Sequence, residues 1–186
     1  KFLTGQLNHH FLFNTLNNLY GLSIKKDDCA PEVILNLSDI MSYTLYESNN
    51  EKVSLVKELE FIRNYIELER MRYTNDKNIQ FQFPEEEELF GFFIAPLLTF
   101  TFVENAFKYG LQGNKEQFIY LDIKVKDNVF YFHLENDKEK QINHKEFGGI
   151  GITNASKRLQ LLYADKHQLK IENLENKFTV NLKIDL

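Results

Sequence analysis

Residues 96–110 read PLLTFTFVENAFKYG, an apolar stretch whose spacing predicts a buried amphipathic helix. Its polar exceptions are Glu104, Asn105 and Lys108. Lys108 follows Asn105 by three residues and Glu104 by four, so the three side chains form one patch on the helix. One interpretation is a solvated helix face with a single ion pair. The other is a nucleotide site: Asn105 ligates Mg²⁺, Lys108 neutralises phosphate charge, and Glu104 orients or deprotonates an attacking group.

A second segment, residues 6–19, reads QLNHHFLFNTLNNL and sets an imidazole, His10, directly before the apolar run Phe11–Phe13. Asn14 lies four residues after His10 and therefore on the same face of the predicted helix. An amide can hold one ring nitrogen of a histidine and leave the other free to react. From these residues alone, packing and chemistry explain His10 equally well.

A third segment, residues 148–163, reads GGIGITNASKRLQLLY and places three glycines before a predicted helix. Glycines let a backbone approach phosphate closely, and the amides at a helix N-terminus favour an anion. A plain glycine-rich loop is the alternative.

The three segments, in this order, resemble the motifs of LytS-like sensor histidine kinases, which share an ATPase fold with GHKL chaperones, MutL and gyrase B. Residues 6–17 resemble the phosphoacceptor motif QxNPHFLFNxLN, with His9 in place of proline. Residues 96–110 resemble the N-box PxLLQxLVENAxKHG, with Thr99, Phe100 and Tyr109 as departures. Residues 147–163 resemble the G-box GxGIGLxNxxxRLxLxY, with Phe147 in place of its first glycine. A fourth stretch, at residues 54–73, resembles the family segment LxxELxxIxxYLxLExxRF.

The resemblance implies roles for the matching residues. His10 is the phosphoacceptor, Asn14 holds its ring, and Glu104 activates or positions the nucleophile. Asn105 is the magnesium ligand, and Arg158 either binds phosphate or makes a structural ion pair. The residues that the resemblance assigns to ATP are Asn105, Lys108, Tyr109, Asn136, Gly149, Gly151, Asn154 and Arg158.

Residues 134–138, LENDK, stand where the family usually has DxGxG at the end of a strand. In the family, the aspartate of that motif accepts a hydrogen bond from the adenine amino group. By strand parity Asn136 shares a face with Phe132 and Leu134 and takes the aspartate's place. An asparagine oxygen accepts such a bond without charge assistance. A bulge would instead bring in Asp137.

The spacing of apolar residues predicts an α+β chain in two parts. Residues 1–75 are expected to form an antiparallel helical hairpin for dimerisation and phosphotransfer, with Pro31 opening its second helix and Ser54 capping the continuation. Pairing two copies into a four-helix bundle would bury the apolar faces. Residues 76–186 are expected to form an α/β sandwich, the ATP-binding catalytic domain of the histidine-kinase (GHKL) type, with helices on one face of a mainly antiparallel sheet.

Within the second part, alternation predicts the strands and helical spacing predicts the helices. The expected strands are 79–83, 118–126, 129–135, 168–174 and 178–184; the expected helices are 97–110 and 153–163. Asp127-Asn128 has the composition of a tight hairpin turn, and the acidic run 85–88 is expected to be a solvated loop.

Composition excludes some classes of protein. The net charge of −5 argues against a nucleic-acid-binding surface, and the single Cys29 fits a reducing cytoplasm. No apolar run reaches the roughly 20 residues of a membrane span. Because Lys1 falls inside a predicted helix without a start methionine, we expect the cytoplasmic portion of a longer protein. Any inner-membrane anchor would lie in the missing N-terminal region.

The resemblance implies a sensor histidine kinase of a two-component system, an ATP- and Mg²⁺-dependent phosphotransferase. As a homodimer it would phosphorylate its own His10 and pass the phosphoryl group to an aspartate of a response regulator, often one with a LytTR-type DNA-binding domain. The alternative is a catalytically weak or dead pseudokinase scaffold that binds the regulator. This alternative stays open because Asn136 stands in place of the aspartate that binds adenine in the family. A different ATPase of the same fold, such as an anti-sigma kinase or a chaperone, would leave the phosphoacceptor-like motif at residues 6–17 unexplained.

Overall fold

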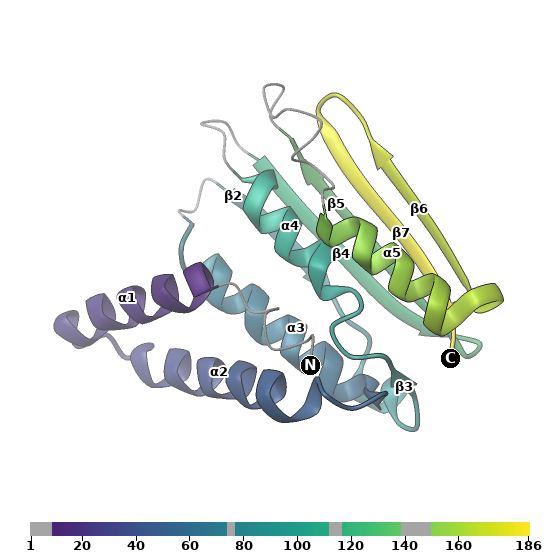
Figure 1. Ribbon diagram of the computed structural model, residues 1–186. Coiled ribbons are helices and arrows are strands. Elements are labelled where there is room, and N and C mark those ends of the chain that lie inside the picture. The colour runs from purple at the N-terminus through teal and green to yellow at the C-terminus, as the bar shows by residue number, and fades with distance from the viewer. Residues whose placement is uncertain (1–8, 74–76, 112–116, 139–149) are drawn as a thin grey trace.

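The computed structural model describes residues 9–73, 77–111, 117–138 and 150–186, and it has the expected α+β architecture (Figure 1). The helical part contains α1 (His9–Lys25), α2 (Ala30–Ser42) and α3 (Leu55–Arg70). α1 and α2 run in opposite directions as a hairpin (Figure 1). α3 does not continue α2: it is a separate helix that returns against α2, so the expected pair of long helices is a set of three.

Local chemistry explains where these helices begin and end. Pro31 lies in the first turn of α2, where its missing N–H costs nothing. The hydroxyl of Ser54 accepts a hydrogen bond from the backbone N–H of Lys57 at 3.3 Å and caps α3, as predicted. After α2 the chain winds into a π-helical turn, η1 (Tyr43–Glu47), and Ser48 bonds back to the carbonyl of Thr44 at 2.6 Å. The regular helix is therefore interrupted between α2 and α3.

A five-stranded sheet forms the second part, in the order β2-β4-β5-β7-β6. Its strands are β2 (Lys77–Gln82), β4 (Gln117–Lys126), β5 (Val129–Asp137), β6 (His167–Asn173) and β7 (Lys177–Asp185). β2 lies parallel to β4, and every other neighbouring pair is antiparallel. Asp127 and Asn128 have φ of 53° and 60°, as a type I′ hairpin between β4 and β5 requires.

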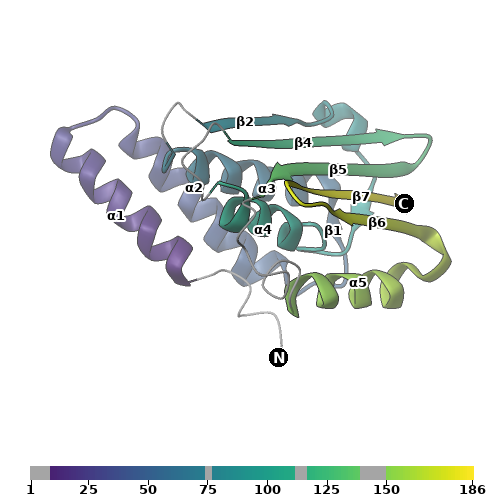
Figure 2. The ribbon, with the colours of Figure 1, turned by 90° about the horizontal axis from the view of Figure 1, so that it is seen from above.

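The helices α4 (Phe100–Gly110) and α5 (Ile150–Tyr163) cover one face of this sheet, and none of the described helices lies on the other face (Figures 1 and 2). α3 lies beyond α4, and its aromatic rings join the two helices. The Phe100 ring centroid is 5.1 Å from that of Phe61 and 4.9 Å from that of Tyr65. One hydrophobic core therefore runs from Phe11 in α1 to Ile184 in β7.

Two expected elements differ in detail, and one pairing of strands was not expected. The helix predicted from residue 97 begins at Phe100, because residues 96–99 form a turn in which Leu97 has φ of 54°. The acidic run is not a loop but a short 3₁₀ helix, η2 (Glu86–Leu89), closed by a capping box between Glu85 and Glu88. A two-strand pairing of β1 (Val53–Ser54) with β3 (Phe93–Ile94) was not expected. In the described part of the chain no helix combines the length and apolar character that a membrane crossing requires.

Candidate active site

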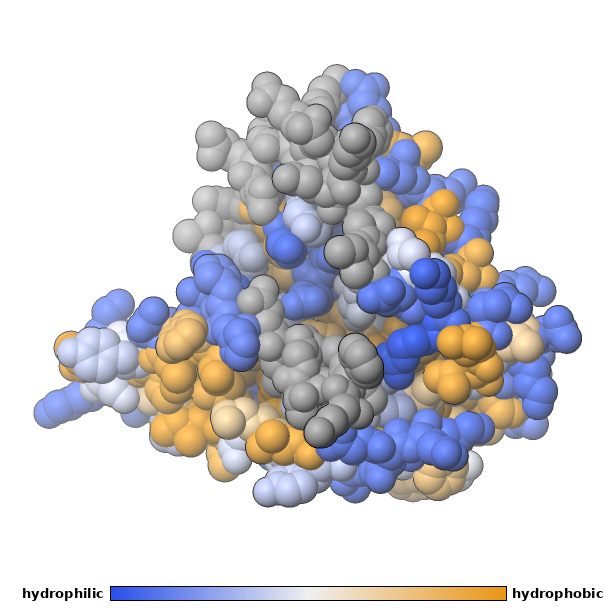
Figure 3. Space-filling view, in the orientation of Figure 1, coloured by the Kyte–Doolittle hydropathy of each residue, from blue (hydrophilic) through white to orange (hydrophobic). Residues whose placement is uncertain are grey.

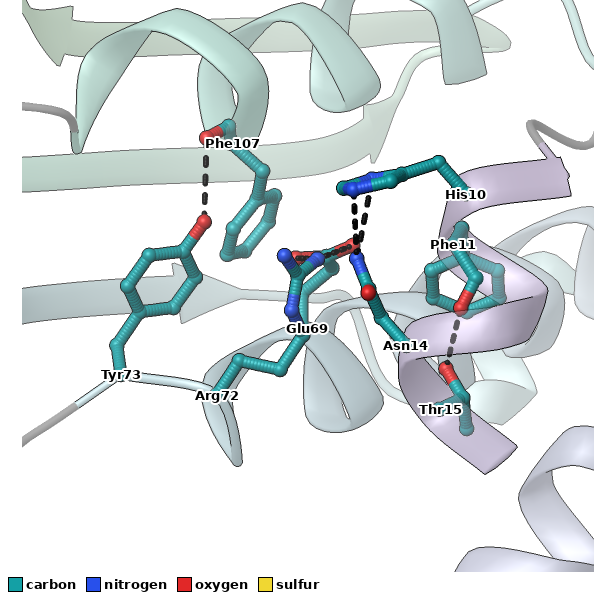
Figure 4. A network of polar contacts seen from close by, with 8 residues as sticks. All are labelled: His10, Phe11, Asn14, Thr15, Glu69, Arg72, Tyr73 and Phe107. Carbon is teal, nitrogen blue, oxygen red and sulfur yellow. Dashed lines mark hydrogen bonds and ion pairs between the residues drawn. The ribbon is translucent and has the colours of Figure 1, made fainter. Parts of the chain in front are cut away.

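His10 and Asn14 lie on one face of α1, as their spacing predicts (Figure 4). The Nδ2 atom of Asn14 is 3.0 Å from Nδ1 of His10 and 3.3 Å from Nε2. The neighbouring Phe11 is buried against Tyr65 of α3, with ring centroids 4.8 Å apart, while His10 itself is exposed. Phe11 therefore fixes α1 on the body of the molecule and leaves the imidazole accessible.

His10 lines a cavity of about 400 Å³ between three helices. α4 contributes Glu104 and Lys108 to its wall, so two of the three predicted polar residues of that helix share a cavity with the predicted phosphoacceptor. The complete lining is His10, Phe11, Tyr65, Glu69, Arg72, Tyr73, Glu104, Phe107, Lys108 and Leu111. Segments that are distant in the sequence, α1 and α4, therefore meet around one imidazole.

Glu104 is half-buried at this cavity. Burial raises the pKa of its carboxyl, Lys108 opposes that rise, and Glu69 adds to it. A carboxyl with a raised pKa is better matched to accept a proton near neutral pH than an ordinary glutamate. Lys108 also lies 4.9 Å from the ring centroid of Tyr109, and Asn105 is half-buried on the adjoining face of α4.

Glu69 at the end of α3 and Arg72 just after that helix belong to this cavity, although the sequence prediction did not include them. Arg72 Nη1 lies 2.9 Å and 2.8 Å from the two carboxylate oxygens of Glu69 (Figure 4). Burial raises the pKa of Glu69, whereas Arg72, Tyr65 and the charge of His10 lower it. The signal that could have found both residues is the segment at 54–73, where they match the glutamate and arginine of LExxRF.

Asn136 points into the core from β5, as strand parity predicts, and it is fully buried. Its Nδ2 donates to the carbonyl of Asp137 at 2.7 Å, and its Oδ1 has no hydrogen-bond partner among the described residues. The ladder with β4 is regular here, with Ile119 opposite Asn136, so no bulge brings in Asp137. Asp137 instead accepts a hydrogen bond from the N–H of Phe118 at 3.1 Å.

The glycine-rich segment is described only from Ile150 onward, so Gly149 lies outside the described residues. Gly151 packs closely on α4, since a Cβ there would come within 3.0 Å of Thr101. Asn154 is exposed. Arg158 donates to the carbonyl of Pro96 at 2.8 Å and approaches that of Leu97 at 3.4 Å, a set of contacts that favours the structural alternative.

Comparison with known proteins finds similarity to the same group of kinases that the sequence motifs resemble. A family model described as histidine kinase matches residues 1–77. The sensor protein LytS of Staphylococcus saprophyticus is 28% identical over 93% of the chain, which spans 31% of that protein. The sensor histidine kinase YpdA of Escherichia coli is also 28% identical over 93%, and the chain spans 32% of it. The sensor histidine kinase/phosphatase LytS of Staphylococcus aureus is 29% identical over 93% of the chain, which spans 32% of that protein.

Solved structures support the fold. The histidine kinase domain of a blue-light activated histidine kinase from Erythrobacter litoralis superposes with a TM-score of 0.51 at 12% identity, covering 86% of this chain and 75% of that one. The catalytic domain of histidine kinase ThkA gives a TM-score of 0.50 at 15% identity and covers 72% of this chain and 93% of that one. The chain spans about a third of the length of its curated relatives, and within that third the predicted resemblance is confirmed: this is a relative of the LytS-like sensor histidine kinases, with the fold of a histidine-kinase catalytic domain.

Proposed function

We propose that the chain is the kinase core of a two-component sensor, which uses ATP to phosphorylate its own His10. The observation that carries this proposal is the cavity that His10 shares with Glu104 and Lys108. Phosphoryl transfer depends mainly on positioning the nucleophile and neutralising charge, and a cavity with an imidazole, a carboxylate and a cation supplies both.

His10 acts as a neutral imidazole in this proposal. The lone pair of one ring nitrogen forms a bond to the γ-phosphorus of ATP, while the bond from that phosphorus to its bridging oxygen breaks and its electron pair leaves with ADP. Asn14 holds the other ring nitrogen. A 180° rotation of its amide places Oδ1 rather than Nδ2 beside the ring, where it accepts the N–H and keeps the lone pair on the attacking nitrogen.

Residues outside the cavity lining also suit the substrate. Asn136 offers a fully buried oxygen without a partner among the described residues, and the amino group of adenine is a donor that would satisfy it. Asn105 would hold Mg²⁺, an ion that prefers oxygen ligands and neutralises phosphate charge. Lys108 adds a positive charge, and Glu104 positions the nucleophile or takes its proton. Tyr109, Gly149, Gly151 and Asn154 complete the proposed ATP site, and Arg158 supports it through the backbone before α4.

The partner of this reaction is an aspartate on a response regulator, to which phospho-His10 would transfer its phosphoryl group. The relatives are named sensor protein and sensor histidine kinase, which supports this class of signalling. A LytTR-type regulator, a homodimer formed through the helical region and an anchor in the inner membrane through a further N-terminal region are parts of the same proposal. So is the division at residue 75 between a dimerisation and phosphoacceptor region and the catalytic domain.

Labelling with γ-³²P ATP tests the proposal. The purified chain should incorporate label at His10 in the presence of Mg²⁺, and the His10→Ala variant should incorporate none. Label retained in His10→Ala would exclude His10 as the acceptor. Asn105→Asp should lose labelling because the magnesium ligand is changed, and full activity in that variant would exclude Asn105 as the ligand.

A pseudokinase scaffold is the second candidate, and the uncharged Asn136 is the observation that favours it. Titration with ATP at millimolar Mg²⁺ separates the two functions. Binding together with label on His10 supports the kinase. A folded chain that binds a response regulator but neither binds ATP nor labels would identify the scaffold.

A further inference from the structure

Two glutamate–arginine pairs with the same spacing lie at the C-terminal end of α3 and just beyond it, and they differ in length and in burial. Glu67 and Arg70 form an exposed pair at 3.3 Å, with 38% of the glutamate side chain accessible. Glu69 and Arg72 form a shorter pair at 2.8 Å, with 4% of the glutamate side chain accessible. Burying a carboxylate is costly even when it is paired, so stability alone does not explain the second pair.

The surroundings of Glu69 point toward the phosphoacceptor. Figure 4 shows the ring of His10 reaching from α1 toward the Glu69–Arg72 pair at the end of α3. His10 and Glu69 line the same cavity, and the charge of His10 lowers the pKa of Glu69. The carboxylate of Glu69 is therefore near enough to the imidazole for their charges to act on each other.

The geometry also fixes where the carboxylate of Glu69 can lie. Arg72 contacts both of its oxygens, at 2.8 and 2.9 Å, and Tyr65, one turn earlier on α3, lines the same cavity. The ring of Tyr65 is in turn packed against Phe11, the neighbour of His10. The same cluster of side chains therefore holds α1 and surrounds the carboxylate.

When a ring nitrogen of histidine forms a bond to phosphorus, the ring gains positive charge. A preorganised negative group stabilises such a charge. We propose that Glu69 is the positioning residue of the phosphoacceptor: its carboxylate, held by Arg72, orients the ring of His10 and stabilises the positive charge that grows on it during the attack. This rests on the proposed function, and it leaves to Glu104 the acceptance of the proton.

The test is steady-state autophosphorylation at a series of ATP concentrations. Glu69→Gln keeps the shape and removes the charge, so the maximal rate should fall by about 100-fold while the KM for ATP stays within twofold. Glu67→Gln removes the matched, exposed carboxylate and should behave as the wild type. Glu69→Asp keeps the charge and the pairing with Arg72, and it should recover part of the rate.

Each outcome decides between the proposals. A wild-type chain that labels His10 together with a Glu69→Gln variant of equal rate would overturn the role of Glu69 and leave the kinase intact. A raised KM with an unchanged maximal rate would also overturn it, because Glu69 would then serve nucleotide binding. A wild type without label on His10 would overturn both proposals. If Glu69→Gln does not fold, Glu69→Asp decides: a rate equal to the wild type would contradict a requirement for precise placement.

Discussion

At the residue scale, Gly110 at the end of α4 packs closely against Asn136 on β5. A Cβ at position 110 would lie 2.8 Å from Nδ2 and 3.0 Å from Cβ of Asn136. Because Asn136 is fully buried, it has little room to move. We expect Gly110→Ala to lower the free energy of unfolding by about 1–3 kcal/mol, measured by urea denaturation.

Two variants control this prediction. Gly21→Ala in α1 adds the same methyl group where no atom lies within 4 Å, and it should raise stability by up to about 1 kcal/mol through helix propensity. Asn136→Ala should relieve the clash, so the double variant should lose less than the sum of the two single changes. Additive losses would show that the two residues do not collide.

The sequence predicted the inward direction of Asn136 because strand parity is a local property of β5. It did not predict the contacts of Arg158, whose partners are the carbonyls of Pro96 and Leu97 some sixty residues earlier. Glu69 escaped notice for the same reason. Glu69 shares a cavity with His10 only because α1 packs beside α3. The spacing of apolar residues within α3 does not reveal which side chain of another helix will face Glu69.

At the scale of elements, a buried polar cluster joins η1, α3 and the turn before α4. Glu58 of α3 accepts a hydrogen bond from the hydroxyl of Tyr43 and one from the backbone N–H of Leu97 at 3.0 Å. Its Oε1 has no partner within the described ranges. Burial raises the pKa of Glu58 to about 7, against the effect of both hydrogen bonds.

This cluster makes stability depend on pH. The folded pKa of Glu58 lies above its ordinary value of 4.5, so the folded chain keeps a proton that the unfolded chain has released. The stabilisation is complete below pH 4.5 and is lost as the pH rises through about 7, and it amounts to something on the order of 3 kcal/mol.

Glu58→Gln should remove that dependence, since the amide keeps the shape and an acceptor oxygen without a titrating group. Thermal unfolding of the wild type and of Glu58→Gln should be compared from pH 4.5 to 8. The difference between the two proteins isolates Glu58 from other carboxyls such as Glu69 and Glu104, which are present in both. A difference that stays constant with pH would contradict the assignment.

The extent of agreement between sequence and structure also varies by element. Strands β4 to β7 and the turn at 127–128 were predicted closely. The alternation of apolar and polar residues and the residue types that favour a positive φ are both visible within a few sequence positions. The start of α4 was misplaced by three residues. Leu97 is turned into a left-handed conformation whose N–H bonds Glu58, and that contact comes from another part of the chain.

At the scale of the whole molecule, apolar side chains remain exposed on the helical hairpin. Figure 3 shows them gathered at the lower left, over α1 and α2. The exposed large ones on these two helices are Phe13, Leu16, Tyr20, Ile24, Ile34, Leu35 and Met41. A patch of this kind is typical of a surface that associates with another protein, and a second copy of the hairpin would complete a four-helix bundle.

Sedimentation equilibrium tests that association. The wild type should be a dimer, and Leu35→Glu, at a position 65% exposed on α2, should be largely monomeric. Leu161→Glu on α5, at a position 82% exposed, places the same charge away from the hairpin and should remain dimeric. A dimer that survives Leu35→Glu would place the interface elsewhere.

The shared cavity also predicts which chain of such a dimer phosphorylates which. His10 already lies beside Glu104 and Lys108 of its own chain, so we expect phosphorylation within one chain. Mixed dimers of His10→Ala with Asn105→Asp should therefore remain unlabelled, because neither chain has both an acceptor and a magnesium ligand. Restored labelling in the mixture would show transfer between the chains.

The contact between Gly110 and Asn136 has a further consequence, for how the sequence of this site can change in descent. A residue larger than glycine at position 110 is accommodated only where position 136 has a smaller side chain than asparagine. Substitutions at the two positions are therefore expected to covary among relatives. Aspartate is isosteric with asparagine and one nucleotide change away from it. The carboxylate that LytS-like kinases usually present to adenine is therefore within a single mutational step of this chain, and it would put an oxygen in place of the Nδ2 that now donates to the carbonyl of Asp137.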